Sequence, residues 1–353
     1  MQQLTFLSPG KFEWRDVPAP KLAADTDAIV APVAVARCDL DLYIANGVAP
    51  YPGPFAFGHE TVARVVEAGS ASGVRPGDLV VVPFQLSCGR CRNCRRGHTN
   101  ACEAYPFGAA YGLKPTSKTE FGGALSDLMY VPFADHMLVH LPAGIDPVAA
   151  ASLSDNIADG WRGVAGPLTE RPGANVLVVG GLARSVGLYA AGAAVALGAG
   201  RVLYLDDDAG RRAAAEAMGA VSEPLALAEG RQPGEQFEIV VEAAGTVEAL
   251  GFAVNSCAPN GYLAGLSIHF GNKTPMPLTA AYLKGLTFHT SRVHSRATFP
   301  EALSCMTCGR FHPERVTSRV VPFAEAAEAM TDPGPKIVFT RYGWLDLAAP
   351  PRQ

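Results

Sequence analysis

Four cysteines with regular spacing lie in the segment 88–102, which reads CGRCRNCRRGHTNAC. Cys88, Cys91, Cys94 and Cys102 follow the pattern C-x2-C-x2-C-x7-C, and four thiolates at such spacing can surround one tetrahedral zinc ion. Because four sulfur ligands leave no open position for water or substrate, the pattern predicts a structural ion that holds a polar loop in place. Four unrelated free thiols are the alternative, which the spacing disfavours.

A catalytic zinc ion needs three protein ligands and one open position, and its ligands are usually a mixture of Cys, His and carboxylate. The candidates are Cys38 in ARCDLDLY, His59 in GHE, and an acid further along the chain. Taken alone, Cys38 also suits a buried apolar cysteine and His59 a hydrogen-bonded core histidine. Spacing by itself does not join these residues into one site.

A glycine-rich turn in VVGGLARSVG contains Gly180, Gly181 and Gly187. Backbone N–H groups in a turn between a strand and a helix can approach a pyrophosphate, and the N-terminus of the helix adds positive potential. The pattern G-x-G-x-x-G is not met, since Leu182 and Arg184 occupy its first two glycine positions counted back from Gly187. A plain strand-to-helix crossover is therefore the alternative.

An acidic residue, Asp206, ends the predicted strand RVLYLD, nineteen residues after Gly187. An acid at this place accepts hydrogen bonds from the ribose hydroxyls of the adenosine and repels a 2′-phosphate. The residue therefore predicts NAD rather than NADP as the cofactor. The neighbouring Asp207 and Asp208 are alternatives for the same role.

The elements that must position these residues change in type near the middle of the chain. From Leu4 to about Leu141, short β-rich runs are broken by Pro and Gly, which is typical of an all-β, barrel-like domain. The runs are AIVAPVAVA, TVARVVEAG, DLVVVPF and SDLMYVPF. After them, Asp146 can cap a helix that has Pro147 at its first position.

The second half of the chain alternates predicted strands and helices, which favours a parallel sheet. The segments are, in order, NVLVVGG, SVGLYAAGAAVALGA, RVLYLD and AGRRAAAEAMGA. Further strands are predicted at FEIVVEAAG, GYLAGLSI and LTFHTSRV, and a helix at FPEALSCMTCGRF. Residues 1–155 and 294–353 are predicted to form a catalytic domain that includes the lobe 88–102, and residues 156–293 a dinucleotide-binding domain, with the active site in the cleft between them.

Length and composition indicate a two-domain globular protein that acts on small molecules. A chain of 353 residues with 48% apolar and 18% charged residues excludes disorder. A net charge of −4 gives no field for nucleic acid or anionic lipid. We find neither a signal-peptide pattern nor a run of ~20 apolar residues, which predicts a soluble cytoplasmic protein. A reducing compartment favours thiolate metal ligands over disulfides for its eight cysteines.

The succession of CDLD, GHE, the four-cysteine lobe and the glycine-rich turn resembles the zinc-dependent alcohol dehydrogenases of the medium-chain dehydrogenase/reductase superfamily. The resemblance covers nearly the whole chain and implies a GroES-like β-rich catalytic domain plus a Rossmann-type doubly wound parallel sheet. It matches Cys38 and His59 to two ligands of the catalytic zinc, Glu60 to a nearby glutamate, and Asp41 to the aspartate that orients the histidine.

The resemblance also supplies a third ligand and two cofactor contacts. Asp155, five residues before Gly160 in LSDNIADG, matches the third zinc ligand and is similar to the formaldehyde dehydrogenase branch; a helix cap is the alternative role. Arg211 matches a basic residue that reaches the ribose, and Lys336 one that meets the pyrophosphate. Solvent-exposed positions are the alternative for both.

The chain departs from the family at the proton relay. Leu40 stands where a Ser or Thr starts the relay and cannot carry a proton, and Tyr43 stands where a His often ends it. Asp39 also lies beside the expected pyrophosphate position. His140, His289 and His294 are spare acid or base candidates for which core or surface roles are more typical. The C-x2-C pair Cys305 and Cys308 is interpreted as packing rather than metal binding.

The resulting hypothesis is a zinc-dependent NAD(H) oxidoreductase that interconverts an alcohol and an aldehyde or ketone by hydride transfer. One catalytic and one structural Zn²⁺, a small-molecule alcohol or carbonyl substrate, and a homodimer or homotetramer are implied. One alternative is an enzyme of the same fold that reduces a double bond or imine, or whose reaction has no net redox change. The other is a non-catalytic nucleotide-binding scaffold.

Overall fold

The computed structural model describes residues 1–271 and 273–341, which divide into two compact units. The first unit contains Met1–Ala158, His294–Leu303 and the described residues from Thr317 onward. The second unit contains Asp159–Val293 and Ser304–Val316. The chain crosses between the units four times, twice inside helices, in α6 (Asn156–Glu170) and α11 (Ser295–Thr307), and twice in connecting segments at 293–294 and 316–317.

The segment 304–316 belongs to the second unit, whereas the sequence-based division placed it in the catalytic domain. The Phe311 ring packs edge-on against Trp161 at 5.5 Å. Arg310 and Arg315 donate hydrogen bonds to the carbonyls of Ala196 and Ala217. These contacts attach the end of α11 and the following turn η3 (Pro313–Val316) to the second unit.

The first unit is built around two β-sheets, which agrees with the β-rich domain predicted for this part of the chain. A seven-stranded sheet has the order β15-β16-β3-β5-β6-β8, with β7 paired to β3, and a three-stranded sheet has the order β2-β1-β4. The strands are β1 (Gln2–Ser8), β2 (Lys11–Asp16), β3 (Ala28–Ala36), β4 (Phe55–Ala56), β5 (Glu60–Ala68), β6 (Leu79–Val82), β7 (Met129–Val131), β8 (Val139–His140), β15 (Arg319–Pro322) and β16 (Ile337–Thr340). Every residue of β3 is buried, because β3 lies within the sheet.

Short helices connect these strands. They are α1 (Asp39–Ala45), α2 (Arg92–Arg95), η1 (Thr99–Ala101), α3 (Lys114–Ser117), α4 (Ala134–Met137), α5 (Pro147–Ala150), η2 (Ala151–Ser154), η4 (Phe323–Glu325) and α12 (Ala326–Ala329). The predicted cap at Asp146 is confirmed, since its side chain accepts a hydrogen bond from the Val148 N–H and Pro147 begins α5. An acidic cap of this kind satisfies a backbone donor that has no partner within the helix.

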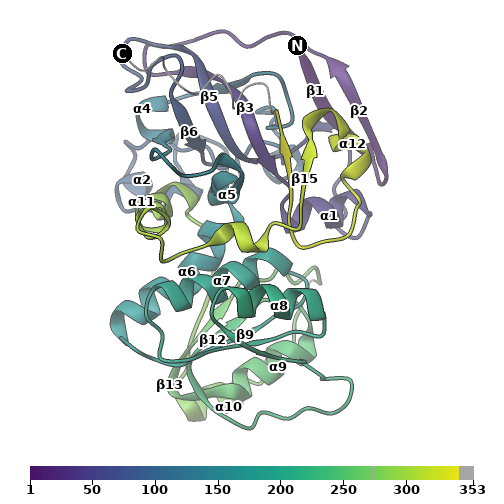
Figure 1. The fold of residues 1–353 in the computed structure, drawn as a ribbon, viewed down its shortest axis with the longest axis vertical. Helices are drawn as coiled ribbons and strands as arrows, with labels where there is room; N and C mark the ends of the chain where they lie inside the picture. Colours follow the sequence, from purple (N-terminus) through teal and green to yellow (C-terminus); the bar gives the residue numbers. More distant parts are fainter. Residues whose placement is uncertain (272, 342–353) are drawn as a thin grey trace. The chain divides into compact units, whose positions relative to one another are not determined.

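The second unit is a doubly wound parallel sheet of six strands in the order β11-β10-β9-β12-β13-β14. The strands are β9 (Val176–Val179), β10 (Val202–Leu205), β11 (Val221–Glu223), β12 (Phe237–Glu242), β13 (Cys257–Gly265) and β14 (Thr287–Thr290). The helices are α7 (Arg184–Ala196), α8 (Ala209–Ala217), α9 (Val247–Ser256) and α10 (Leu278–Lys284). In Figure 1 the strands lie between α7 and α8 on one side and α9 and α10 on the other.

The central strands of this sheet come from continuous apolar segments, in which apolar and polar residues do not alternate. The strands β9 and β10, with sequences VLVV and VLYL, are buried at every position, as expected for parallel strands that are covered on both faces. The small residues of α7 are buried along most of the helix and allow it to lie close to the sheet. The Rossmann-type prediction is therefore confirmed.

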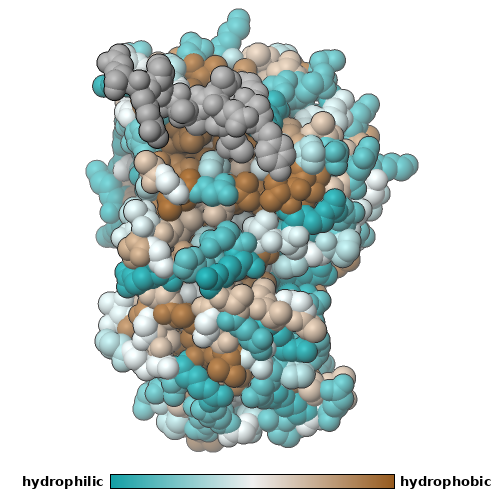
Figure 2. Space-filling view, viewed as in Figure 1, coloured by the Kyte–Doolittle hydropathy of each residue, from teal (hydrophilic) through white to brown (hydrophobic). Residues whose placement is uncertain are grey.

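The surface is in keeping with the composition. Figure 2 shows a face with many hydrophilic and neutral side chains and smaller apolar areas between them. Among the described residues, no helix combines the length and the apolar character that crossing a membrane requires.

Candidate metal centres and nucleotide-binding turn

Cys38, His59 and Asp155 come together in the first unit although they are far apart in the sequence. Cys38 precedes α1, His59 precedes β5, and Asp155 precedes α6. The Cys38 Sγ lies 3.1 Å from Asp155 Oδ2, and the His59 Nε2 lies 3.4 Å from the same oxygen. Ligand atoms bound tetrahedrally to zinc at about 2.0–2.3 Å lie roughly 3.3–3.7 Å apart, so the group is nearly arranged for one ion. The Cys38 thiol donates a hydrogen bond to this carboxylate oxygen.

A local capping arrangement positions the first of these ligands. Cys38 is the N-cap of α1, and its sulfur accepts from the Leu40 N–H at 3.4 Å. Asp41 accepts from the Cys38 N–H through Oδ2 at 3.0 Å, and its Oδ1 lies 3.4 Å from His59 Nδ1. The predicted role of Asp41 in orienting the histidine is therefore compatible with the geometry. The first turn of α1 therefore positions Cys38 directly and His59 through Asp41.

The ligand group carries a surplus of acidic side chains. Burial raises the pKa of the Cys38 thiol, and the carboxylates of Asp155, Glu60 and Asp41 raise it further. Burial lowers the pKa of His59, but Asp41 and Asp155 outweigh this effect and raise that pKa to about 9. A dication would offset these negative charges and keep Cys38 as a thiolate. The donor set and its charge both fit zinc.

Glu60 and Lys336 form a fully buried ion pair behind the ligands, with Nζ 2.9 Å from Oε2. The Lys336 ammonium also donates to the Arg37 carbonyl at 2.9 Å and to Asn156 Oδ1 at 2.7 Å. This placement differs from the predicted contact of Lys336 with a cofactor phosphate. A fully buried ammonium with three acceptors presents no surface to a phosphate. The prediction is corrected for that reason.

Asn156 is a functional candidate that the sequence reasoning missed. Its amide nitrogen donates to Cys38 Sγ and to Asp155 Oδ2, each at 3.3 Å. Its backbone N–H donates to Glu60 Oε1 at 3.0 Å. Its position directly after Asp155 was the one sequence feature that could have drawn attention to it.

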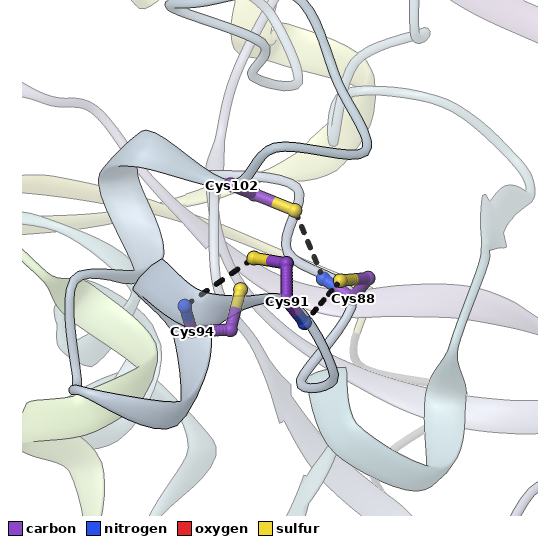
Figure 3. A group of neighbouring side chains, drawn as sticks. All are labelled: Cys88, Cys91, Cys94 and Cys102. Atoms are coloured by element: carbon purple, nitrogen blue, oxygen red, sulfur yellow. Dashed lines mark hydrogen bonds between the residues drawn. The ribbon is translucent and has the colours of Figure 1, made fainter.

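The four cysteines of the lobe face one another, as Figure 3 shows. Their four sulfur atoms lie within 4.8 Å of one another. Backbone N–H groups point at the sulfurs: those of Cys91 and Cys94 donate to Cys88 and Cys91 at 3.4 Å, and that of Cys88 donates to Cys102 at 3.3 Å. The predicted four-thiolate group is therefore assembled by the loop itself.

The electrostatics of this lobe favour the thiolate form of Cys91. Burial raises the pKa of Cys91, but the N–H groups of Cys94 and Glu103 donate to its sulfur and lower that pKa to about 6. The thiolate is the form that binds metal. Burial raises the pKa values of Cys94 and Cys102 instead, so this backbone donation favours the thiolate form at Cys91 and not at those two residues.

Close contacts explain the first two glycines of the turn between β9 and α7, since Gly180 faces the Asp206 and Tyr204 side chains and Gly181 faces the Ala244 backbone. A Cβ added at Gly180 would lie 2.5 Å from Asp206 Oδ2, and one added at Gly181 would lie 2.6 Å from the Ala244 Cα. Gly187 lies within α7, where an added Cβ would meet the Ala243 side chain at 3.1 Å. The first two glycines are thus required sterically.

Asp206 and Arg211 are brought together at the end of β10. Asp206 is 1% exposed and accepts two hydrogen bonds from the Arg211 guanidinium, at 2.7 and 2.6 Å, and one from the Tyr204 hydroxyl at 2.8 Å. A bidentate pair of this kind is strong and geometrically specific. Ribose hydroxyls would have to share this carboxylate with Arg211.

The two neighbouring acids have other roles, which distinguishes them from Asp206. Asp208 caps α8 by accepting from the Arg211 N–H at 2.8 Å. Asp207 accepts from the Ala226 N–H at 2.8 Å. Asp206 is the acid of the three that lies against Gly180.

The remaining candidates are dispersed. Leu40 and Tyr43 are half-buried in α1, and His140 is exposed and lies 3.0 Å from Asp78. His289 is exposed on β14 in the second unit, whereas His294 belongs to the first. Cys305 is buried, which agrees with the packing interpretation, but Cys308 is exposed, which does not.

The fold and the two ligand groups together define a class, the medium-chain zinc-binding dehydrogenases. Residues 24–143 match the family described as alcohol dehydrogenase GroES-like domain, and residues 185–307 match zinc-binding dehydrogenase. The probable zinc-binding alcohol dehydrogenase Rv1895 of Mycobacterium tuberculosis is 31% identical over 315 residues, which cover 88% of this chain and 79% of that protein. The chain belongs to the zinc-dependent alcohol dehydrogenase family of the medium-chain dehydrogenase/reductase superfamily, a family of oxidoreductases.

Two further comparisons agree with this assignment. Glutathione-independent formaldehyde dehydrogenase of Pseudomonas aeruginosa is 33% identical over 230 residues, which cover 61% of this chain and 56% of that protein. The structure of alcohol dehydrogenase TADH from Thermus sp. ATN1 superimposes with a TM-score of 0.85 at 29% identity, covering 96% of this chain and 99% of that one. The fold and the family agree.

Proposed function

We propose that this protein is a zinc-containing, NAD(H)-dependent alcohol dehydrogenase that interconverts an alcohol and an aldehyde or ketone by hydride transfer. The observation that carries the proposal is the meeting of Cys38, His59 and Asp155, whose ligand atoms lie within 4.8 Å of one another. Family membership supports the reaction class. A second, structural zinc would be held by the four-cysteine lobe.

The residues of the chain would divide the chemistry between them. A zinc ion held by Cys38, His59 and Asp155 would supply Lewis-acid polarisation of a substrate oxygen. Asp41 would keep the His59 imidazole in a fixed orientation from 3.4 Å away. Because Leu40 has no hydroxyl, Tyr43 on the same helix is the residue we propose to pass a proton through its phenol oxygen.

NAD rather than NADP is the proposed cofactor. The support is Asp206, whose buried carboxylate lies at the end of β10 and would repel a 2′-phosphate. Gly180 and Gly181 would let backbone N–H groups approach the pyrophosphate, and Arg211 would lie beside the ribose. A relative named NADP-dependent isopropanol dehydrogenase, from Thermoanaerobacter brockii, is 30% identical over 293 residues, so the competing cofactor must be measured directly.

Turnover with a panel of substrates tests the proposed reaction. Primary alcohols, polyols and aldehydes would be supplied with NAD or NADH, and the absorbance of the reduced nicotinamide followed together with product formation. We expect stoichiometric change in the parent protein and at least a hundredfold less in Asp155→Ala. Product formed without net change in NADH would instead favour the reaction with no net redox change. Nicotinamide binding without turnover of any substrate would favour the scaffold alternative.

We also propose that the protein assembles as a homodimer or homotetramer through the second unit. Strand β14 lies at one edge of the parallel sheet, and all four of its residues are exposed. On the adjacent helix α10, Tyr282 and Leu283 are 84% and 77% exposed. An edge strand beside exposed apolar side chains favours pairing with a second copy.

A further inference from the structure

We propose that Asn156 is a positioning residue of the metal site, which donates hydrogen bonds from one amide group to two of the ligands, Cys38 and Asp155. The inference rests on the proposed function, since it concerns the proposed zinc ligands. It goes beyond that function because it assigns a role to a residue that is not one of the proposed metal ligands.

The contacts of the Asn156 amide determine which way it points. Its Oδ1 accepts from the Lys336 ammonium at 2.7 Å and from the Asp39 N–H at 3.2 Å. Its Nδ2 donates to Cys38 Sγ and Asp155 Oδ2 at 3.3 Å. A reversed amide would place its NH₂ against two donors and its oxygen against the Cys38 sulfur and the Asp155 carboxylate. The contacts on both sides therefore exclude that orientation.

The β-sheet brings Lys336 to the place where it can hold the amide. Strands β16 and β3 pair antiparallel, with Val338 opposite Ala36. Lys336 directly precedes β16, and Arg37 directly follows β3, so the Lys336 side chain reaches the Arg37 carbonyl and the region beneath Cys38. The sheet register thus sets the position of the amide.

Glu60 completes the support from the other side. Its Oε1 accepts from the Asn156 backbone N–H at 3.0 Å, and its Oε2 accepts from the Ser152 hydroxyl at 2.8 Å and from the Lys336 ammonium at 2.9 Å. Asn156 is 3% exposed, and Glu60 and Lys336 are fully buried. Backbone and side chain of Asn156 are therefore both held at the first turn of α6.

The hydrogen bonds from the Asn156 amide affect two ligand atoms, Cys38 Sγ and Asp155 Oδ2. An N–H donor directed at a thiolate sulfur stabilises the sulfur lone pairs and reduces the charge that the sulfur gives to a metal. The same amide restrains the Asp155 oxygen that faces His59. Asn156 would therefore raise metal affinity by fixing the ligands and would tune the electron donation of Cys38. Residues that support metal ligands in this way typically change affinity by about 10–100-fold.

Two substitutions separate hydrogen-bond donation from simple packing. Asn156→Asp preserves the shape of the side chain and its contact with the Lys336 ammonium but removes both donor hydrogens. Asn156→Ala removes the side chain altogether. Asn255→Asp, on the exposed face of α9, is the matched control for the added charge, because its amide donates to the Gly251 carbonyl and touches no proposed ligand.

The experiment uses Co²⁺ as a spectroscopic substitute at the Cys38 site, in protein whose four-cysteine lobe keeps zinc. The thiolate-to-cobalt charge-transfer band is recorded against Cys38→Ser protein, which lacks this thiolate. We expect the band to move to longer wavelength in both Asn156 variants, because the sulfur lone pairs lose a stabilising donor. We expect zinc affinity, measured by chelator competition, to fall at least tenfold in Asn156→Ala.

The outcomes are distinguishable. An unchanged band in both Asn156 variants, with Co²⁺ bound as in the parent, would overturn the role of Asn156 while leaving the metal site intact. A parent protein that binds no ion through Cys38 would overturn the proposed function and this inference together. A band shift in the Asn156 variants but not in Asn255→Asp supports the inference.

Discussion

At the scale of residues, the proposed catalytic metal site combines a thiol, an imidazole and a carboxylate within a buried cluster of further acids. The Cys38 thiol faces the carboxylates of Asp155, Glu60 and Asp41, and Lys336 supplies one positive charge beside them. A carboxylate is a harder ligand than a thiolate and leaves a bound zinc more electrophilic. Because the acidic groups outnumber the one basic group there, we expect this region to need a bound dication for its stability.

Metal content tests this interpretation. We expect two zinc ions per chain in the parent protein, one in Asp155→Ala and one in Cys94→Ser, because each variant loses a ligand of a different site. Metal analysis of the purified proteins provides the count. A single ion in the parent that persists in Asp155→Ala and disappears in Cys94→Ser would remove the catalytic site from the proposal.

In the proposed function, Tyr43 passes the proton because Leu40 has no hydroxyl to do so. General acid–base assistance is worth roughly 10²–10⁴-fold, so Tyr43→Phe should lower turnover at least tenfold. Nicotinamide affinity and zinc content should stay as in the parent, since the ring is preserved. Turnover is measured with a substrate for which hydride transfer limits the rate. Unaltered turnover would exclude Tyr43 from the relay.

In the proposed function, the preference for NAD over NADP depends on Asp206. A hydrogen bond to a charged group contributes about 1.5–3 kcal/mol, or roughly one to two decades of affinity. We therefore expect the parent to bind NAD more tightly than NADP, and Asp206→Ala to reduce or reverse that preference, because Arg211 is released from its partner. Calorimetric titration with both nucleotides measures the ratio, and Asp207→Ala is the matched control. Tighter binding of NADP by the parent would contradict the assignment.

At the scale of elements, close contacts with neighbouring residues explain the glycines of the turn between β9 and α7, although the turn does not match the pattern G-x-G-x-x-G. Leu182 and Arg184 interrupt the spacing of the familiar motif, yet the turn still joins β9 to α7 at the centre of the sheet. The two glycines that the close approach requires are Gly180 and Gly181.

Gly181→Ala tests the steric role of this turn. The new Cβ would meet the Ala244 Cα at 2.6 Å, so the backbone must shift. We expect lower thermal stability and at least tenfold weaker nicotinamide binding. Gly251→Ala, within α9 and with open space around the added carbon, is the control and should raise stability by about 0.5–1 kcal/mol. Equal behaviour of the two variants in binding and melting experiments would refute the steric argument.

At the scale of the whole molecule, the proposed assembly rests on a difference between the two edges of the parallel sheet. Strand β14 at one edge is flanked by the exposed Tyr282 and Leu283 of α10, whereas β11 forms the other edge, where Val221 is 50% exposed. Apolar side chains that are this exposed favour burial against a second copy.

Charge placed on the β14 side should break that assembly. We expect a dimer or tetramer by light scattering for the parent, a smaller species for Leu283→Lys, and the parental size for Val221→Lys. The reason is that an unpaired charge at an apolar contact loses its hydration. A monomeric parent, or equal dissociation by both variants, would contradict this mode of assembly.

Much of the architecture could be predicted because strands and helices depend on local patterns. The continuous apolar runs VLVV and VLYL predict buried parallel strands, and Asp146 followed by Pro147 predicts a helix start. The segment 304–316 was misplaced because its unit membership depends on distant contacts, such as that between Phe311 and Trp161. Periodicity carries no information about such partners.

The sequence by itself determined the four-cysteine lobe and the order of strands and helices, because ligands fourteen residues apart and elements a few residues long are governed by local spacing. Only the tertiary structure decided that Lys336 is buried against Glu60 rather than exposed, and that Asn156 reaches Cys38 across 118 positions of sequence. The pairing of β3 with β16 brings these side chains together. Hydrogen bonds between residues so distant depend on sheet register and burial, which no local spacing encodes.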